Sequence, residues 1–209
     1  LFHCGLRFSN QAIRQYIANK DFIDGGAYIG DSAAVFAKYY FPRKVYSFDI
    51  SKKIFDKYVQ TMTQNKIPDD KYEFINMGLF DKKCETLIKD DAHQGTNLYS
   101  KGSAVCKLCD LDSFAQTHSL NIGFIKSDLE GVGLDGLKGM VQTIKKDRPV
   151  LSLAIYHNPI EFFDMKIYLE KIVENLDYTI HIKQFHPFHD AVVEVALFAY
   201  PKELDITID

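Results

Sequence analysis

Short apolar runs alternate along this chain with longer stretches in which apolar residues recur at helical spacing. The runs predict strands at residues 22–25, 45–49, 72–76, 121–128, 150–156, 178–183 and 191–200. The stretches between them predict helices at residues 32–40, 51–65, 134–145 and 161–176. Because strand and helix alternate, we expect an α/β fold in which helices cover both faces of a central, mostly parallel sheet.

Spacing and stop signals support these assignments. Ile54, Tyr58 and Met62 recur every four residues, which places them on one face of a helix. Ser51 stands before that helix and is a favourable N-cap residue. Pro42 ends the preceding helix, because the residue before a proline avoids the helical region. The last two predicted strands follow each other without a helix, so we expect them to form an antiparallel edge of a sheet of about seven strands.

The segment 80–111 interrupts this alternation. It contains Gly95 and Gly102 between two stretches of alternating residues, which indicates an inserted hairpin or a long loop. Long irregular segments inside a compact domain often act as lids over a binding site. Residues 1–20 form a lead-in to the first strand, and the chain contains no internal repeat and no linker. We therefore expect residues 1–209 to form a single domain.

Composition and charge argue against several classes of protein. With 46% hydrophobic residues in a chain of 209, a substantial core can be buried and disorder is not expected. The net charge is −3 and no dense basic run is present, which disfavours nucleic acid as a partner. No apolar stretch is long enough to cross a bilayer. Four cysteines do not make a disulfide framework in a domain of this size, so we expect a reducing, cytoplasmic location. The oligomeric state stays open.

A glycine-rich turn follows the first predicted strand, and an acidic residue ends the second. Residues 21–32 read DFIDGGAYIGDS, and Asp49 closes the next strand one helix later. This pairing is typical of nucleoside cofactor sites in α/β sheets, where the acid binds the ribose hydroxyls. A dinucleotide site needs G-x-G-x-x-G, but Ala27 occupies the position of the second glycine. We therefore interpret the turn as a site for S-adenosylmethionine, and we disfavour an NAD-dependent dehydrogenase.

Several residues of this motif have an expected part in holding that cofactor. Gly26 allows the methionine portion to lie against the backbone, and Asp24 can bind its ammonium group directly or through water. Asp49 would accept both ribose hydroxyls, with Ile50 near the adenine. Residues 76–79 follow the third strand and either line the adenine pocket or form an ordinary glycine turn. The alternative for the whole motif is a strand–helix turn in which glycine only relieves steric crowding.

Charged residues gather where the fourth and fifth predicted strands end. Lys126, Asp128 and Glu130 are spaced by two residues, so their side chains point to one side of a strand. Three charges there are costly unless they face a polar cleft. The two carboxylates could position the substrate, contact the cofactor or bind a divalent cation, and we expect no metal. His157, which follows Tyr156 at the end of the next strand, is either a general base for a hydroxyl nucleophile or a histidine at a helix entry.

With these residues in view, the chain resembles the FkbM-type methyltransferase family. The segments that carry the resemblance are DGGAYIGDS at 24–32, VYSFD at 45–49, LDSF at 111–114, IKSDLEG at 125–131, LKG at 137–139, and Pro149 leading to Tyr156-His157. The Lys-x-Asp-x-Glu-Gly block is the most specific of them. Two departures are that Asp49 stands where the family more often has Glu, and that the chain after about residue 165 matches weakly.

The resemblance implies the Rossmann-like class I methyltransferase fold and methyl transfer from S-adenosylmethionine, usually to a hydroxyl oxygen of a sugar, polyketide or other small metabolite. The cofactor would be bound by Asp24, Gly26, Ala27, Tyr28, Gly30, Asp31, Ser32, Asp49, Ile50, Ser51, Gly78, Leu79 and Asp128. The acceptor, a small molecule or carbohydrate, would be bound by Glu130, Tyr156 and His157. Catalysis would fall to His157 and Lys126. A nucleic-acid methyltransferase and a non-catalytic nucleoside-binding or scaffold domain remain the alternatives.

Overall fold

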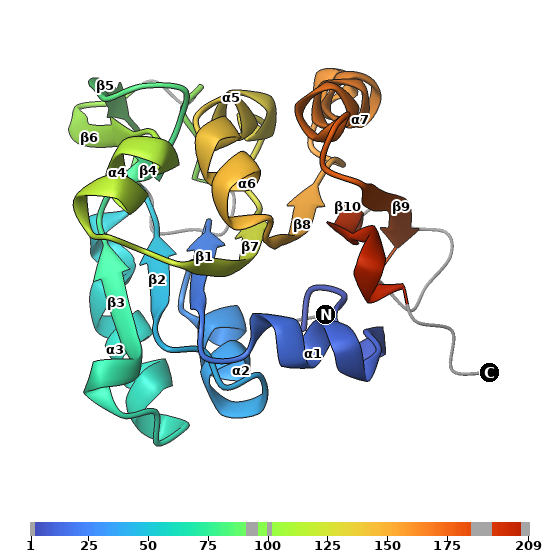
Figure 1. The fold of residues 1–209 in the computed structure, drawn as a ribbon. Helices are drawn as coiled ribbons and strands as arrows, with labels where there is room; N and C mark the ends of the chain where they lie inside the picture. The colour runs from blue at the N-terminus through green and yellow to red at the C-terminus, as the bar shows by residue number, and fades with distance from the viewer. Residues whose placement is uncertain (1–2, 91–95, 100–101, 185–193, 206–209) are drawn as a thin grey trace.

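A seven-stranded sheet forms the centre of the molecule in the computed structural model, which describes residues 3–90, 96–99, 102–184 and 194–205 (Figure 1). Its strands are β1 (Asp21–Gly25), β2 (Val45–Phe48), β3 (Tyr72–Ile75), β7 (Ile122–Ser127), β8 (Val150–Ala154), β9 (Tyr178–Gln184) and β10 (Val195–Pro201). They lie in the order β3-β2-β1-β7-β8-β10-β9. The neighbours among β3, β2, β1, β7 and β8 pair in parallel, and β10 runs antiparallel to both β8 and β9. The expected mostly parallel sheet with an antiparallel edge is confirmed.

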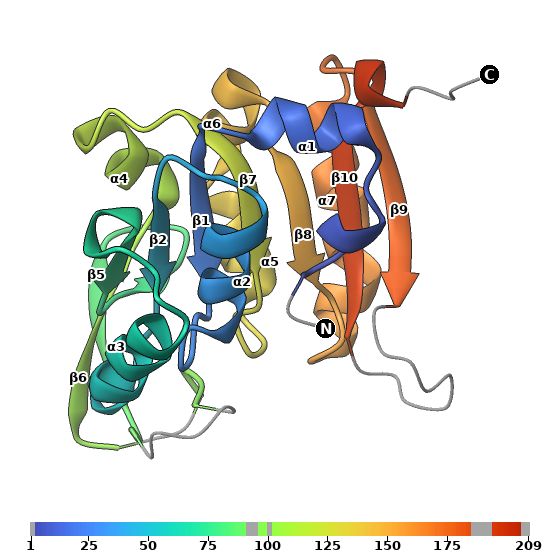
Figure 2. The ribbon, with the colours of Figure 1, turned by 90° about the horizontal axis from the view of Figure 1, so that it is seen from below.

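Helices cover both faces of this sheet, as expected (Figures 1 and 2). One face carries α1 (Gln11–Ile17), α2 (Asp31–Tyr39) and α3 (Phe55–Gln64), and the other carries α4 (Leu111–Thr117), α5 (Gly133–Lys138), α6 (Val141–Asp147) and α7 (Pro159–Val173). Short 3-10 turns cover Leu6–Phe8, Lys52–Ile54, Asp69–Lys71 and Lys202–Leu204. Each face buries its own apolar core, so β1 and β7 between the two cores are buried along their whole length. Among the residues described, no helix combines the length and apolar composition of a membrane span.

The segment 80–111 contributes most of a second, smaller sheet. The strands of this sheet are β4 (Gly78–Leu79), β5 (Cys84–Ile88) and β6 (Ala104–Cys109), in the order β4-β6-β5. Because β5 and β6 pair antiparallel, the expected hairpin is confirmed. Figure 1 shows this sheet on the side of the molecule that carries β2 and β3. Its function as a lid stays a prediction, and residues 91–95 and 100–101 within it lie outside the described residues.

One predicted helix is two helices in the structure. The stretch 134–145 was expected to be continuous, but α5 ends at Lys138 and α6 begins at Val141. The break lies at Gly139, where an added Cβ would come 1.9 Å from the carbonyl oxygen of Phe80. The backbone N–H of Asp112 also donates to the Gly139 carbonyl at 3.0 Å, which occupies a group that a continuous helix would use itself. Contact with the inserted segment therefore divides the helix.

Candidate active site

The carboxyl ends of β1, β2 and β7 surround a cavity of about 340 Å³, which we call the central cavity. Residues from all three ends reach it, among them Gly26 after β1, Asp49 after β2 and Asp128 after β7. The predicted site residues that line it are Gly26, Tyr28, Asp31, Ser32, Asp49, Ile50, Gly78, Leu79, Lys126, Asp128 and Glu130. A pocket at this edge of a parallel sheet is where α/β folds hold their ligands, and its volume is in the usual range for such sites.

Both oxygens of Asp49 are fixed by backbone donors. The N–H of Tyr28 donates to Oδ2 at 2.8 Å, and the N–H of Ser51 donates to Oδ1 at 2.8 Å. Tyr28 reaches this position because its backbone is left-handed, with φ of 46°. Burial raises the pKa of Asp49, although these two hydrogen bonds oppose the rise. Each carboxylate oxygen keeps acceptor capacity after these bonds, so the group is held in place and can still accept hydrogen bonds from a ligand.

Asp24 lies beneath the cavity and not on its wall. Its side chain is fully buried, and its Oδ1 lies 3.0 Å from the Nζ of Lys126, which also donates to the Gly26 carbonyl at 2.7 Å. Burial alone would lower the pKa of Lys126, but the carboxylates of Asp24 and Asp128 outweigh it and raise that pKa. Asp24 therefore does not line the cavity, and its expected contact with the cofactor stays a prediction. The residue balances the charge of Lys126, which itself reaches the cavity.

We expect Lys126→Met to lower the free energy of unfolding by about 3 kcal/mol, because it leaves the buried Asp24 carboxylate without its cation. The double variant Asp24→Asn/Lys126→Met removes both charges and should recover part of the loss. Lys166→Met, which breaks the exposed pair with Glu170, should change stability by about 0.5 kcal/mol or less. Urea unfolding followed by far-UV circular dichroism measures all three. Equal losses for Lys126→Met and Lys166→Met would contradict the prediction.

Three other predicted cofactor residues do not line the cavity. Ala27 is buried in the core on the face of α1 to α3. Gly30 packs against the side chains of Tyr58 and Met62. Ser51 is buried and donates its hydroxyl to Asp90 at 2.6 Å. These residues belong to the turns that carry the cavity residues, but they do not line the cavity themselves.

The sequence reasoning missed several residues of the cavity wall, namely Cys4, Phe48, Ile54, Thr96, Leu98, Leu129, Val132 and Glu194. Phe48 precedes Asp49 directly and Ile54 follows it by five residues, so closeness in sequence to the predicted ribose-binding acid was a usable signal. Thr96 and Leu98 belong to the segment expected to be a lid, and they bring that segment to the cavity. Cys4 had no signal, because only the fold brings the lead-in segment here. Burial raises the pKa of its thiol to about 12, which leaves it protonated and unreactive.

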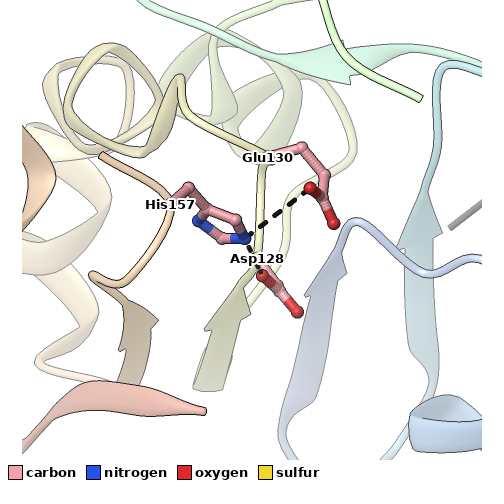
Figure 3. Close-up of side chains that lie close together, drawn as sticks. All are labelled: Asp128, Glu130 and His157. Atoms are coloured by element: carbon pink, nitrogen blue, oxygen red, sulfur yellow. Dashed lines mark ion pairs between the residues drawn. The ribbon is translucent and has the colours of Figure 1, made fainter. Parts of the chain in front are cut away.

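Asp128, Glu130 and His157 form a compact cluster at the edge of this cavity (Figure 3). His157 Nε2 lies 3.0 Å from Asp128 Oδ1 and 3.9 Å from Glu130 Oε2. On the other side of the ring, Nδ1 lies 2.9 Å from Oε2 of the buried Glu161. Tyr156 packs its ring against that of His157 and donates its hydroxyl to Asp128 at 3.4 Å. The predicted substrate residues therefore meet, with Glu130 on the cavity wall and the two rings behind it.

The protonation of this cluster bears on the predicted catalytic role of His157. Burial would lower the pKa of His157, but the adjacent carboxylates of Asp128 and Glu161 outweigh it and raise that pKa to about 10. Burial would raise the pKa of Asp128, but the contact with His157 and the charge of Lys126 lower it. An imidazolium has no lone pair with which to accept a proton. These surroundings disfavour the interpretation of His157 as a general base at neutral pH.

Solved structures share this fold at low sequence identity. The FkbM methyltransferase from Methylobacillus flagellatus KT superposes with a TM-score of 0.69 at 18% identity, over 87% of this chain and 44% of that one. An rRNA methylase from Streptococcus thermophilus gives 0.56 at 14% identity, over 91% and 92% of the two chains. A methyltransferase from Streptococcus mutans in complex with SAH gives 0.58 at 12% identity, over 90% and 93%. This chain thus spans less than half the length of the Methylobacillus protein, and the fold is that of class I methyltransferases.

No curated protein matches this sequence. The family model of the methyltransferase FkbM domain matches residues 24–194, from the end of β1 to the residue before β10. That span holds the turn, Asp49, and the cluster of Asp128, Glu130 and His157, so the match includes almost every side chain described around the central cavity. The chain belongs to the FkbM methyltransferase family.

Proposed function

We propose that this domain transfers a methyl group from S-adenosylmethionine to a hydroxyl oxygen of a small molecule or carbohydrate. The observation that carries the proposal is the fixed carboxylate of Asp49 at the wall of the central cavity, beside the turn of Gly26 and Tyr28. Such an acid binds the vicinal hydroxyls of a ribose. The turn leaves no second glycine at Ala27 for a pyrophosphate, which favours a nucleoside without one.

The cavity offers a partner for each end of that cofactor. Asp49 and Ile50 lie where the ribose and adenine would sit, with Gly78 and Leu79 on the same wall. Asp31 opens α2 and lines the cavity, so its carboxylate, in place of the buried Asp24, is placed to bind the ammonium group. Lys126 supplies a cation for the carboxylate of the methionine portion.

The chemistry asks mainly for alignment. The acceptor oxygen attacks the methyl carbon, the C–O bond forms as the C–S bond breaks, and the sulfonium becomes the neutral thioether of S-adenosylhomocysteine (SAH). The hydroxyl proton must leave, and it can pass to Asp128 or Glu130, whose carboxylates face the cavity. His157, held between Asp128 and Glu161, acts as a positioning residue for this wall. Holding oxygen, methyl and sulfur in line supplies most of the rate acceleration.

The acidic balance of the chain supports a small acceptor over a nucleic acid. The net charge is −3. Asp128 and Glu130, on the part of the cavity wall where we expect the acceptor, are carboxylates that repel phosphates. The likeness to the rRNA methylase is a likeness of fold only, and one fold can serve enzymes with many different acceptors. A neutral polyol or sugar hydroxyl is the acceptor that these surroundings favour.

We expect SAH to bind the purified chain with micromolar affinity in calorimetry, and NAD to show no heat of binding above dilution. The reason is the match between the cavity and a nucleoside that lacks a pyrophosphate. Radiolabelled S-adenosylmethionine with pools of sugars and hydroxylated metabolites then reports methyl transfer. Absence of SAH binding in a folded sample would overturn the proposal. Binding without transfer to any acceptor would favour a non-catalytic nucleoside-binding domain.

A further inference from the structure

We propose that Asp128, Glu130 and His157 bind a single divalent cation at the edge of the central cavity. Each residue contributes one donor atom, and the three atoms lie within 4.8 Å of one another (Figure 3). They come from two neighbouring parallel strands, with Asp128 and Glu130 after β7 and His157 after β8. This is the only such group of donors among the residues described.

The separations between the donor atoms fit one ion. Ligands about 2.1 Å from a six-coordinate ion are about 3.0 Å apart when adjacent and about 4.2 Å apart when opposite. His157 Nε2 lies 3.0 Å from the nearer oxygen of Asp128 and 3.9 Å from that of Glu130. Small rotations of the two carboxylates would place all three atoms on one ion.

The second observation is the state of His157 itself. Its side chain is 9% exposed, and its Nε2 atom is buried without a hydrogen bond of acceptable geometry among the described residues. Asp128 Oδ1 is close in distance, but it does not lie where the ring N–H points. A buried ring nitrogen in this state is costly unless another ligand satisfies it. A cation between Asp128 and Glu130 would do so.

Glu161 prepares the ring for such a ligand. Its Oε2 lies 2.9 Å from Nδ1 of His157, and its Oε1 accepts from the backbone N–H of Gly133 at 2.7 Å. The carboxylate is buried and cannot rotate away without losing both contacts. Histidines that bind metals usually donate the other ring N–H to a carboxylate, which fixes the tautomer with a lone pair on the ligating nitrogen. A cation would displace the proton that Nε2 carries in the metal-free protein, and Glu161 would then hold the remaining N–H at Nδ1.

Charge and donor type indicate which ion. Asp128, Glu130 and Glu161 bring three carboxylates to one imidazole, which favours a cation between them. Two carboxylate oxygens suit Mg²⁺ and Mn²⁺, and one imidazole nitrogen shifts the preference toward Mn²⁺. Three protein ligands leave three positions of a six-coordinate ion open on the side of the cavity.

Those open positions narrow the class of acceptor. This step rests on the proposed function. Two neighbouring oxygens of a vicinal diol or a hydroxy-carbonyl compound can occupy two of them. The ion would lower the pKa of the bound hydroxyl. The proton could then pass to the second, unligated oxygen of Asp128 or Glu130, while the methyl group passes to the acceptor oxygen. The acceptor class becomes compounds with two adjacent oxygens.

Mn²⁺ binding to the metal-free full chain tests the site without any acceptor. Electron paramagnetic resonance measures the loss of the free Mn²⁺ signal as protein is added, and calorimetry gives the affinity. We expect binding in the micromolar range for the wild type and at least a 30-fold weaker affinity for Glu130→Gln and for His157→Gln. Glu161→Gln should weaken it about 10-fold, because it disturbs the orientation of the ring and leaves the ligands in place.

Glu174→Gln is the matched control, because it removes an exposed carboxylate from the other end of α7. It should bind Mn²⁺ as the wild type does. Thermal unfolding identifies any variant that fails to fold, and because Glu130 is only half-buried, its variant should be the better tolerated of the two ligand variants. A wild type that shows no binding below millimolar Mn²⁺, or folded Glu130→Gln and His157→Gln variants with wild-type affinity, would overturn the site. SAH binding in the same samples reports separately on the proposed function.

Discussion

Asp49→Ala should weaken SAH binding about 100-fold while the chain stays folded. Each hydrogen bond to a charged group contributes about 1.5–3 kcal/mol. The substitution would remove the hydrogen bonds to both ribose hydroxyls at once. A loss of about 3 kcal/mol corresponds to a factor of about 100 in affinity. Asp49 is held in place by Tyr28 and Ser51, so the free protein has already fixed the orientation that the ligand uses. Calorimetric titration with SAH measures the effect.

Two controls make this result specific. Asp49→Glu restores the residue that the family more often carries, and it should retain most of the affinity because the longer side chain still presents two oxygens. Asp56→Ala removes an exposed acid near the start of α3 and should leave SAH binding unchanged. If Asp49→Ala binds SAH as tightly as the wild type in a folded sample, the assignment of the ribose site to this carboxylate is wrong.

The wall of the central cavity that carries Asp49 could be predicted because its signals are local in sequence. The turn at Gly26 and Tyr28 follows β1 directly, and Asp49 follows the next strand. In a parallel sheet these ends lie at one edge, so adjacency in the fold follows from the order of elements alone. The same reasoning placed Asp128 and His157 at this edge, since β7 and β8 are neighbours.

What could not be predicted depends on contacts between distant segments. From its place before the turn, Asp24 is predicted to bind the cofactor, but in the structure it is buried beneath the cavity and paired with Lys126. Cys4 reaches the cavity wall because residues 1–20, the lead-in segment, pack there. Hydrophobic periodicity cannot predict a contact between segments so far apart in sequence. Glu161 reads as one acid among several on a helix, and only the fold brings it to His157 and the Gly133 backbone.

The same limit explains the errors in the elements. The short helix α4 is capped by Asp110, whose side chain accepts from the N–H of Ser113 at 2.7 Å, but its seven residues carry too little periodicity to reveal it. The expected helix at 134–145 has continuous helical spacing, and its interruption at Gly139 comes from the carbonyl of Phe80. A divalent cation was one of three roles that the sequence left open for Asp128 and Glu130, and we expected none. The distances between Asp128, Glu130 and His157 lead us to revise that expectation.

Gly26→Ala should be the most destabilising of the substitutions discussed, with a loss of about 4 kcal/mol in the free energy of unfolding. The backbone of Gly26 has φ of 72°, which costs an alanine about 1–2 kcal/mol. An added Cβ would also come 1.9 Å from the carbonyl oxygen of Asp128, so the end of β7 must move, at a further cost of about 1–3 kcal/mol. Because the chain contains no Trp, far-UV circular dichroism is the suitable probe in urea.

Gly25→Ala provides a control one residue away. Its added Cβ would meet the Leu79 side chain at 3.0 Å and the Lys126 carbonyl at 3.3 Å, and its φ is not in the left-handed region, so we expect a loss of about 1 kcal/mol. The contrast separates the demand for a left-handed residue from any general effect on β1. Any Gly26→Ala protein that folds should also bind SAH and Mn²⁺ more weakly, because the displaced backbone carries Asp128. Equal stability of the two variants would contradict the prediction, because it would mean that the turn tolerates a side chain at Gly26. The close approach of Gly26 to the Asp128 backbone would then not be required for the shape of the cavity.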